Sequence, residues 1–178
     1  MGGIRFTALS NGCHRLPFIF QRLSFCTCTA ERFAPREMHM RPRVGDRARR
    51  SLTLTRRHVE TFAELTGDYN PLHFDADFAA RTRFGALVVQ GGLTTGLLHA
   101  LVAMDLPGPG SVFLSQSWKF TAPVYVDDTI TAEAEVVSVH ATKPVTQLRI
   151  VVTRQTGETV LEGEAWCYTM SPDGGTGA

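Results

Sequence analysis

The stretch Leu93-Thr-Thr-Gly-Leu-Leu-His-Ala-Leu-Val-Ala-Met-Asp105 decides the fold that this sequence predicts. Its apolar side chains would lie on nearly every side of a helix, and a helix with that pattern is buried rather than placed on a surface. Gly91-Gly92 stands before the stretch, and Pro107-Gly-Pro-Gly110 follows it and ends the helix. The sequence therefore predicts one long helix inside the domain.

The chain after this helix is predicted to form strands. Segments that alternate polar and apolar residues and are rich in Val, Thr and Ile follow one another at residues 112–121, 129–140, 146–155 and 159–170. Gly157 predicts a hairpin turn between the last two, and residues 49–55 form a similar segment before the helix. We expect an α+β structure of the hot-dog type, in which an antiparallel meander and the earlier strand wrap around the long central helix. The strand segments alone would also fit other α+β layer folds.

The region between the first strand and the long helix predicts shorter elements. Thr55 can cap a helix over residues 56–65, and residues 75–81 predict a second short helix. Residues 66–73 form a turn-rich loop, and residues 85–90 form an extended apolar stretch.

The charges are unevenly distributed along the chain. Residues 1–57 hold twelve arginines against three acidic residues, although the formal net charge of all 178 residues is only +1. The first thirty residues contain no acid at all and are rich in Arg, Phe, Leu, Ser, Thr and Cys. Because this composition is typical of a mitochondrial presequence, we expect residues 1–41 to be a targeting segment, residues 42–170 one domain, and residues 171–178 a tail. A basic extension without a targeting role is the alternative. The predicted location is the mitochondrial matrix.

The cysteines and the apolar runs narrow the function classes. Cys167 is the only cysteine in the body of the chain, so no internal disulfide can form there, which fits a reducing compartment. Cys26 and Cys28 lack the spacing of a metal site, and no metal is predicted. No stretch approaches about 20 apolar residues, so no transmembrane helix is predicted. The near-neutral net charge gives no sign of nucleic-acid binding.

The residues that could carry chemistry are concentrated between Asp68 and His73. Asp68, Asn70 and His73 place a carboxylate, an amide and an imidazole within six residues, with a fixed turn at Pro71. A carboxylate and a neutral imidazole around one water molecule form a general acid–base pair. An ordinary turn is the alternative interpretation, because Asp and Asn side chains often bond to nearby backbone and a lone His is often structural.

Gly91-Gly92 is the second candidate feature, because it opens the long helix. The first N–H groups of a helix have no partner within it, and the helix dipole there favours negative charge. Glycine also allows a substrate to approach the backbone closely. A thioester carbonyl placed there would be polarised, although a plain helix entry gives the same sequence.

The stretch Phe62-Ala-Glu-Leu-Thr-Gly-Asp-Tyr-Asn-Pro-Leu-His73 closely resembles the signature of the MaoC-like, R-specific enoyl-CoA hydratase family. That signature ends in Gly, Asp, any residue, Asn, Pro, an aliphatic residue and His. The resemblance covers residues 42–169 and continues in register through Phe78-Ala-Ala80, Phe84-Gly85, Val88-Val89-Gln-Gly91, Pro107-Gly-Pro-Gly-Ser111, Leu114-Ser-Gln116, Phe120, Pro123-Val124 and Asp127-Asp128.

The resemblance implies a hot-dog homodimer that adds or removes water between (R)-3-hydroxyacyl and trans-2-enoyl thioesters. It assigns Asp68 and His73 to the catalytic water and the N–H of Gly91 to the thioester carbonyl. Asn70 would orient the loop or His73. The acyl group would be carried by acyl carrier protein or by coenzyme A, and no cofactor is implied, because the thioester itself acidifies C2.

The acyl chain is expected to run along the long helix, between it and the sheet. The predicted wall residues are Leu72, Phe84, Leu87, Val89, Leu93 and Leu97. Arg81 and Arg83 could meet the phosphates of coenzyme A or the acidic face of a carrier protein, and a solvated basic turn is equally compatible with them. The chain departs from the family pattern at Gln90 (His in many relatives), at Gly92 (a bulkier residue) and at Asp127 (Gly). The extra glycine at 92 could loosen the helix start by up to about 1 kcal/mol.

The favoured interpretation is a mitochondrial (R)-3-hydroxyacyl-acyl carrier protein dehydratase. Three other interpretations of the function remain. The same chemistry could act on free coenzyme A esters. A hot-dog thioesterase would share the fold and ligand, but such enzymes lack the Gly-Asp-x-Asn-Pro-x-His loop found at residues 67–73. A non-catalytic acyl-thioester binding protein is suggested only by Gln90 and Gly92.

Overall fold

The computed structural model describes residues 41–171, and all but the last residue of the predicted presequence and all but the first residue of the predicted tail lie outside them. One antiparallel sheet holds strands β1 (Arg47–Thr53), β2 (Ser111–Phe120), β3 (Thr129–Val139), β4 (Val145–Arg154) and β5 (Thr159–Thr169). The helices are α1 (Arg56–Thr66), α2 (Pro71–Phe74), α3 (Ala76–Ala80) and α4 (Gly91–Met104). None of these helices is long and apolar enough to cross a membrane.

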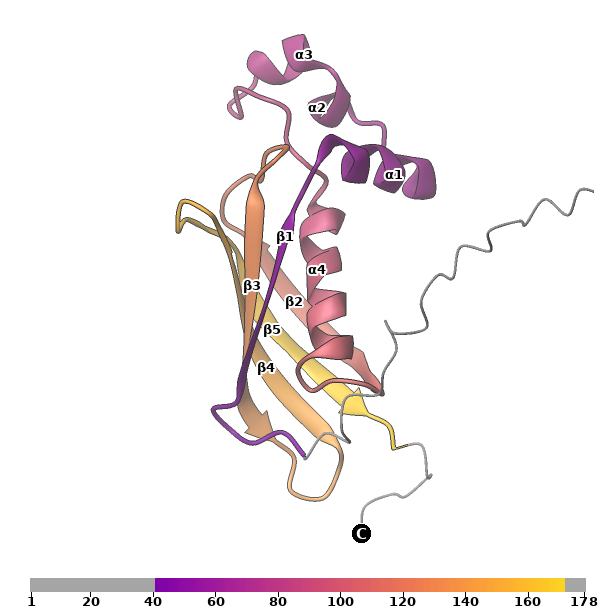
Figure 1. The fold of residues 1–178 in the computed structure, drawn as a ribbon, viewed down its shortest axis with the longest axis vertical. Helices are drawn as coiled ribbons and strands as arrows, with labels where there is room; N and C mark the ends of the chain where they lie inside the picture. The colour runs from indigo at the N-terminus through magenta and orange to yellow at the C-terminus, as the bar shows by residue number, and fades with distance from the viewer. Residues whose placement is uncertain (1–40, 172–178) are drawn as a thin grey trace, which may run out of the picture. The chain divides into compact units, whose positions relative to one another are not determined.

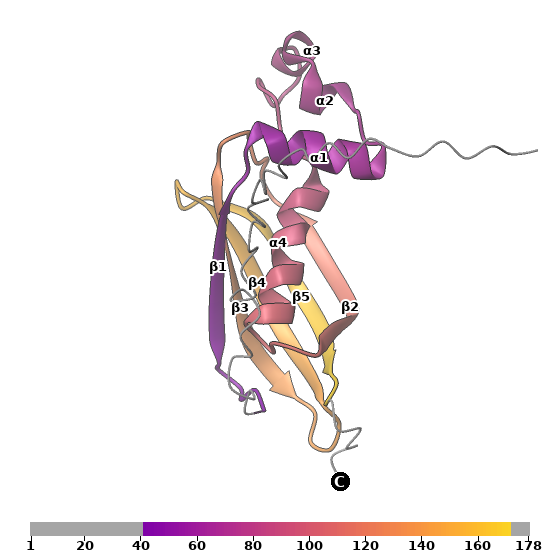
Figure 2. The ribbon, with the colours of Figure 1, turned by 45° about the vertical axis from the view of Figure 1, so that its right-hand side comes forward.

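The sheet curves around α4, so the predicted arrangement of a strongly bent sheet on one long helix is confirmed (Figures 1 and 2). Helix α4 begins at Gly91, two residues before the predicted start. The short helices α1, α2 and α3 lie beyond the N-terminal end of α4 (Figure 1). This places every candidate catalytic residue at one end of the molecule's described part.

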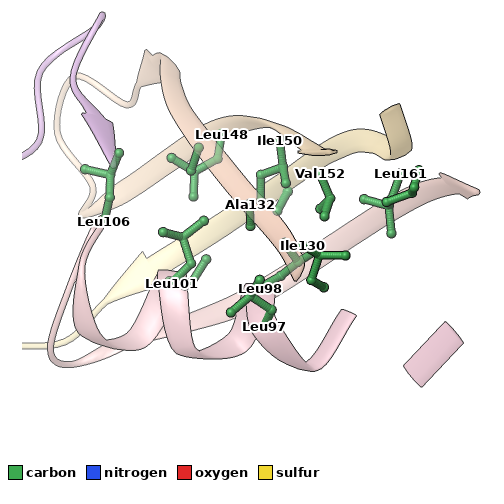
Figure 3. Packing of buried hydrophobic residues seen from close by; sticks show 14 of the residues in the cluster. Leu97, Leu98, Leu101, Leu106, Ile130, Ala132, Leu148, Ile150, Val152 and Leu161 are labelled. Atoms are coloured by element: carbon green, nitrogen blue, oxygen red, sulfur yellow. The ribbon is translucent and has the colours of Figure 1, made fainter. Parts of the chain in front are cut away.

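The core lies between α4 and the inner face of the sheet. Every second residue of β3 from Ile130 to Val136 is buried, because successive side chains of a strand point to opposite faces. Figure 3 shows the two sides meeting: leucines of α4 point toward apolar side chains of β3, β4 and β5. The labelled members are Leu97, Leu98, Leu101, Leu106, Ile130, Ala132, Leu148, Ile150, Val152 and Leu161.

The predicted meander is correct for β3, β4 and β5 and wrong for β2. The strand order is β1-β3-β4-β5-β2, so β2 pairs with β5 at the far edge instead of with the strand that follows it in sequence. The chain from Phe120 to Thr129 therefore crosses from one side of the sheet to the other. Sequence alternation locates a strand but does not specify its neighbour.

Smaller corrections concern the first strand and the connections. β1 begins and ends two residues earlier than predicted. The predicted loop 66–73 ends in a short helix, because Pro71 starts a helical turn and Asn70 Oδ1 accepts a hydrogen bond from Leu72 N at 3.0 Å. His73 is therefore on a helix. The extended stretch 85–90 makes one isolated bridge, between Val88 and Tyr125.

One side of α4 faces away from the sheet. Gly96, His99 and Met104 are exposed on it, and Leu93, Ala100 and Ala103 are half-buried. The sequence predicts that this helix is buried on all sides. In the single chain, only the side that the sheet covers is buried. The edge strand β2 also exposes the apolar residues Val112, Leu114 and Phe120.

Candidate active site

The carboxylate of Asp68 is held in a short loop after α1. Gly67 ends α1 in a left-handed conformation with φ of 78°, which favours glycine because other residues carry a Cβ that clashes there. Asp68 N then donates to Thr66 Oγ1, and Asp68 Oδ1 accepts from Asn70 N at 3.3 Å. These contacts leave Oδ2 directed at His73.

The imidazole of His73 is buried, with 8% of the residue exposed, and its orientation is fixed from behind. Nδ1 lies 2.7 Å from the carbonyl oxygen of Val88. Because a carbonyl only accepts, Nδ1 carries a proton, which leaves Nε2 as the acceptor nitrogen whenever the ring is neutral. Nε2 lies 3.7 Å from Asp68 Oδ2, which is longer than a direct hydrogen bond.

Two hydrogen-bond acceptors that face each other 3.7 Å apart can both bind a single molecule that donates two hydrogen bonds. A water molecule is such a donor, and its oxygen would then keep a lone pair for attack on an electrophilic carbon. The side chain of Asp68 is 42% exposed, so water and substrate can reach it. The geometry is therefore suited to general acid–base chemistry on water.

Asn70 and Leu72 support this turn through their polar atoms. Asn70 caps α2, and its carbonyl accepts from His73 N at 2.9 Å. The carbonyl of Leu72 accepts from Val88 N at 3.2 Å, so two bonds tie the His73 turn to the segment around Val88. A separate hydrogen bond, from Arg56 Nη1 to the carbonyl of His73 at 3.1 Å, ties the turn to α1.

A cavity of about 510 Å³ lies beside this segment, at the N-terminal end of α4. Two stretches of chain that lie far apart in the sequence form its walls. The first wall holds Arg83, Phe84, Val88, Val89, Gly91 and Thr94, and the second holds Phe120, Thr121, Ala122, Pro123, Val124 and Tyr125. The residues predicted from the sequence to line the acyl site include none from the second wall, although Phe120 and Pro123-Val124 belong to the family pattern.

The predicted site residues divide into those that line the cavity and those that do not, and Asp68, Asn70 and His73 belong to the second group. Arg83, Phe84, Val89 and Gly91 line the cavity. Arg81, Leu72, Leu87 and Leu93 are not among its lining residues, and Leu97 packs in the core with 5% of its surface exposed. The expected path between α4 and the sheet is therefore filled by core side chains in this structure, and the open space lies at the helix start instead.

The backbone N–H of Gly91 is free for a ligand. Within residues 41–171 it makes no hydrogen bond to the protein, whereas Leu93 N donates to Gln90 O. A Cβ at Gly91 would lie 3.2 Å from Cζ of Phe120, so only glycine leaves full room between this backbone and the ring. Gly91 thus presents an unpaired donor at the positive end of a helix to the cavity.

A partly buried polar network supports the far wall. Asp128 Oδ2 accepts from Tyr125 N at 2.8 Å and from Arg154 at 3.2 Å, and Oδ1 accepts from Gln155 at 2.5 Å. Burial acts to raise the pKa of Asp128, but these hydrogen bonds outweigh it and hold the pKa below its ordinary value. The hydroxyl of Tyr125 donates to the carbonyl of Phe84 at 3.1 Å, so the network joins both walls.

The departure at Asp127 is explained by this turn. Asp127 has a φ of 70°, the left-handed region that glycine adopts without strain and that Asp tolerates better than most residues. The departure at Gly92 is also explained, because the ring of Phe62 occupies the space where a side chain would be. The contact with the Phe62 ring holds the start of α4 in place, which offsets the loss of stability expected from a second glycine.

Other chemistries find no support among the described residues. No three His, Cys, Asp or Glu side chains gather as metal ligands between residues 41 and 171. Burial raises the pKa of the Cys167 thiol to about 12. The thiol is therefore protonated at neutral pH and is not a nucleophile, since the thiolate is the reactive form.

Known proteins match this sequence and fold. A family model for a MaoC like domain matches residues 41–161. The (R)-specific enoyl-CoA hydratase of Aeromonas caviae is 42% identical over 68% of this chain and 91% of its own. A mitochondrial 3-hydroxyacyl-acyl-carrier-protein dehydratase of Solanum lycopersicum is 33% identical over 69% of this chain and 74% of its own.

Solved structures agree. The Aeromonas caviae (R)-hydratase superposes with a TM-score of 0.70 at 40% identity, covering 72% of this chain and 98% of that one. An unliganded R-hydratase from Pseudomonas aeruginosa gives a TM-score of 0.68 at 35% identity, covering 72% and 82%. The range that the family model matches includes α4 and the Asp68–His73 turn, and the chain belongs to the MaoC-like family with its hot-dog fold.

Proposed function

We propose that this chain is an (R)-3-hydroxyacyl-acyl carrier protein dehydratase of mitochondrial fatty-acid synthesis. In terms of reaction class, it is a hydro-lyase that interconverts 3-hydroxyacyl and 2-enoyl thioesters, like the hydratases and dehydratases among its relatives. The observation that carries the proposal is the pair Asp68 Oδ2 and His73 Nε2, 3.7 Å apart. The hydrogen bond from His73 to Val88 ties this pair to the cavity that Val88 and Gly91, with its free N–H, both line.

In the hydration direction, water held by Asp68 and His73 attacks C3 of the enoyl group. Asp68 accepts a proton from the water as the C3–O bond forms. The electron pair of the C2–C3 double bond moves toward the thioester, and C2 is then protonated from the same face, with His73 relaying the proton. Dehydration is the reverse sequence of these steps.

Gly91 stabilises the charge that develops between these steps. The thioester oxygen becomes an enolate oxyanion, and a fixed N–H at a helix N-terminus stabilises it more than it stabilises the neutral carbonyl. The thioester supplies the acidity of C2, so the reaction requires no cofactor. Phe84 and Val89 would contact the acyl chain, and Arg83 would meet a phosphate or an acidic carrier surface at the cavity.

A second copy of the chain is part of the proposal. The exposed side of α4 carries small and apolar residues, including Gly96, Ala103 and Met104, and the neighbouring edge of the sheet exposes Leu114 and Phe120. A helix with apolar residues all round is stable only when both sides are covered. A homodimer would cover the second side.

The carrier and the reaction are tested with the full chain and two substrates. But-2-enoyl groups on coenzyme A and on acyl carrier protein are each followed by loss of enoyl absorbance and by release of free thiol. We expect hydration of both, a higher kcat/KM for the carrier-protein substrate and no thiol release.

The other results identify the alternatives. A higher kcat/KM for the coenzyme A ester would point to an enoyl-CoA hydratase. Thiol release without hydration would point to a thioesterase, and neither signal with either carrier would point to a binding protein.

The mitochondrial location rests on residues 1–41 and on the mitochondrial dehydratases among the relatives. We expect these residues to direct a fluorescent reporter to the mitochondrial matrix, because they are basic and poor in acid. The matched control replaces the arginines of this segment with glutamine. A wild-type fusion that stays in the cytosol would contradict the proposal.

A further inference from the structure

Gln90 is a buried amide directly beside the candidate oxyanion donor. Only 1% of the residue is exposed, and it stands between Val89 and Gly91, which both line the cavity. It occupies the N-cap position of α4, yet its side chain does not cap that helix. Instead Nε2 reaches across to α1 and donates to the carbonyl of Val59 at 3.2 Å.

The carbonyl oxygen of the Gln90 side-chain amide differs from most buried polar atoms in its hydrogen bonding. Oε1 of Gln90 is buried and has no hydrogen-bond partner among residues 41–171. A buried carbonyl oxygen without a partner lowers stability, whereas an apolar side chain of the same shape at this place would carry no such cost. Stability alone therefore does not explain an amide at this position.

Helix α1 connects Gln90 to the catalytic loop. The ring of Phe62 fills the space over Gly92, and a Cβ at Gly92 would lie 2.3 Å from its Cζ. The carbonyl of Phe62 accepts from Thr66 Oγ1 at 2.7 Å, and the same oxygen atom of Thr66 accepts from Asp68 N. One continuous set of contacts thus runs from the start of α4, through α1, to Asp68.

We propose that Gln90 is a positioning residue that fixes the Gly91 N–H relative to Asp68 by joining α4 to α1. The inference rests on the proposed function, in which Asp68 and Gly91 act on the same thioester. A small shift between a catalytic group and an oxyanion donor reduces turnover more than it reduces ground-state binding. Gln90 would therefore affect kcat and leave KM nearly unchanged.

The test compares Gln90→Met with Gln90→His in the full chain. Methionine has a similar shape but removes both the donor to Val59 and the unpaired oxygen, whereas histidine keeps a ring N–H donor. For Gln90→Met we expect kcat to fall roughly ten-fold, with KM within about two-fold of wild type. The melting temperature is expected to stay the same or to rise. Gln90→His is expected to retain most of kcat.

Gln147→Met is the matched control, because Gln147 is an amide on β4 whose Nε2 bonds to Glu164 on the sheet surface. Wild-type kcat in Gln90→Met would overturn the proposal. So would a parallel loss of kcat and melting temperature in both Gln90 variants, which indicates a structural role only. Asp68→Asn is assayed alongside: if it is active, the proposed function fails, and if it is inactive beside a fully active Gln90→Met, only this inference fails.

Discussion

Asp68→Asn is expected to lower kcat by about 10²–10⁴-fold, the range that a positioned general base contributes. The substitution keeps the shape of the side chain and an oxygen that can accept from Asn70 N, as Asp68 Oδ1 does at 3.3 Å. It removes the negative charge that takes the proton from water. Hydration of but-2-enoyl thioester measures the effect, and circular dichroism and light scattering check that fold and mass are unchanged.

The control for this carboxylate is Asp77→Asn. Asp77 is an exposed acid on α3 that has no histidine partner among residues 41–171, so the same chemical change there is expected to leave kcat within about two-fold. An Asp68→Asn enzyme that turns over at the wild-type rate would remove the acid–base pair from the mechanism.

His73 needs two variants, because its ring is buried. His73→Ala removes the imidazole and also the bond from Nδ1 to the carbonyl of Val88, so a loss of activity could reflect a disturbed turn. His73→Asn offers an amide N–H near the place of Nδ1 and no atom in the place of Nε2. We expect both variants to lose activity to the same degree as Asp68→Asn. Full activity in the folded His73→Asn protein would mean that Nε2 has no role.

The elements that the sequence predicts correctly are those that depend on a local residue pattern. The alternation of residues 129–140 and 159–170 predicted β3 and β5 to within one residue, because a strand with one buried face needs a period of two. The pairing of β2 with β5 was missed, because strand neighbours depend on contacts between residues about fifty positions apart.

The same division holds for the site. The six-residue motif from Asp68 to His73 named the pair that the structure brings within 3.7 Å. Nothing in the sequence identified the carbonyl of Val88 as the group that sets the tautomer of His73. Nor did it place Tyr125 in the cavity wall, since that wall is formed by the crossover from β2 to β3, the connection whose course was predicted wrongly.

The edge strand β2 leads to the second large expected effect, because it reaches the cavity at Phe120. Gly163 of β5 lies opposite Trp118 of β2. A Cβ at Gly163 would lie 2.0 Å from the backbone oxygen of Ser117 and 2.6 Å from a ring carbon of Trp118. The backbone atom cannot turn away as a side chain can, so the two strands must separate before any side chain fits at position 163.

Gly163→Ala is therefore expected to lower the free energy of unfolding by about 3 kcal/mol, at the upper end of the usual cost of overpacking. For a domain of this size that corresponds to a melting temperature roughly 10 °C lower. Glu162→Ala is the control on the same strand: it removes only an exposed pair with Lys119, worth at most about 1 kcal/mol. A Gly163→Ala protein that melts within about 2 °C of wild type would contradict the close approach of β2 and β5.

A double variant separates the two contacts at Gly163. Trp118→Leu in the Gly163→Ala background removes the ring but leaves the backbone oxygen of Ser117 in place. We expect the double variant to recover less than half of the lost stability, because the shorter of the two contacts is the backbone one. Activity is expected to fall with stability in Gly163→Ala, since a displaced β2 also moves Phe120 away from Gly91, where its ring now limits the cavity. Recovery of full stability would instead identify Trp118 as the reason that position 163 is glycine.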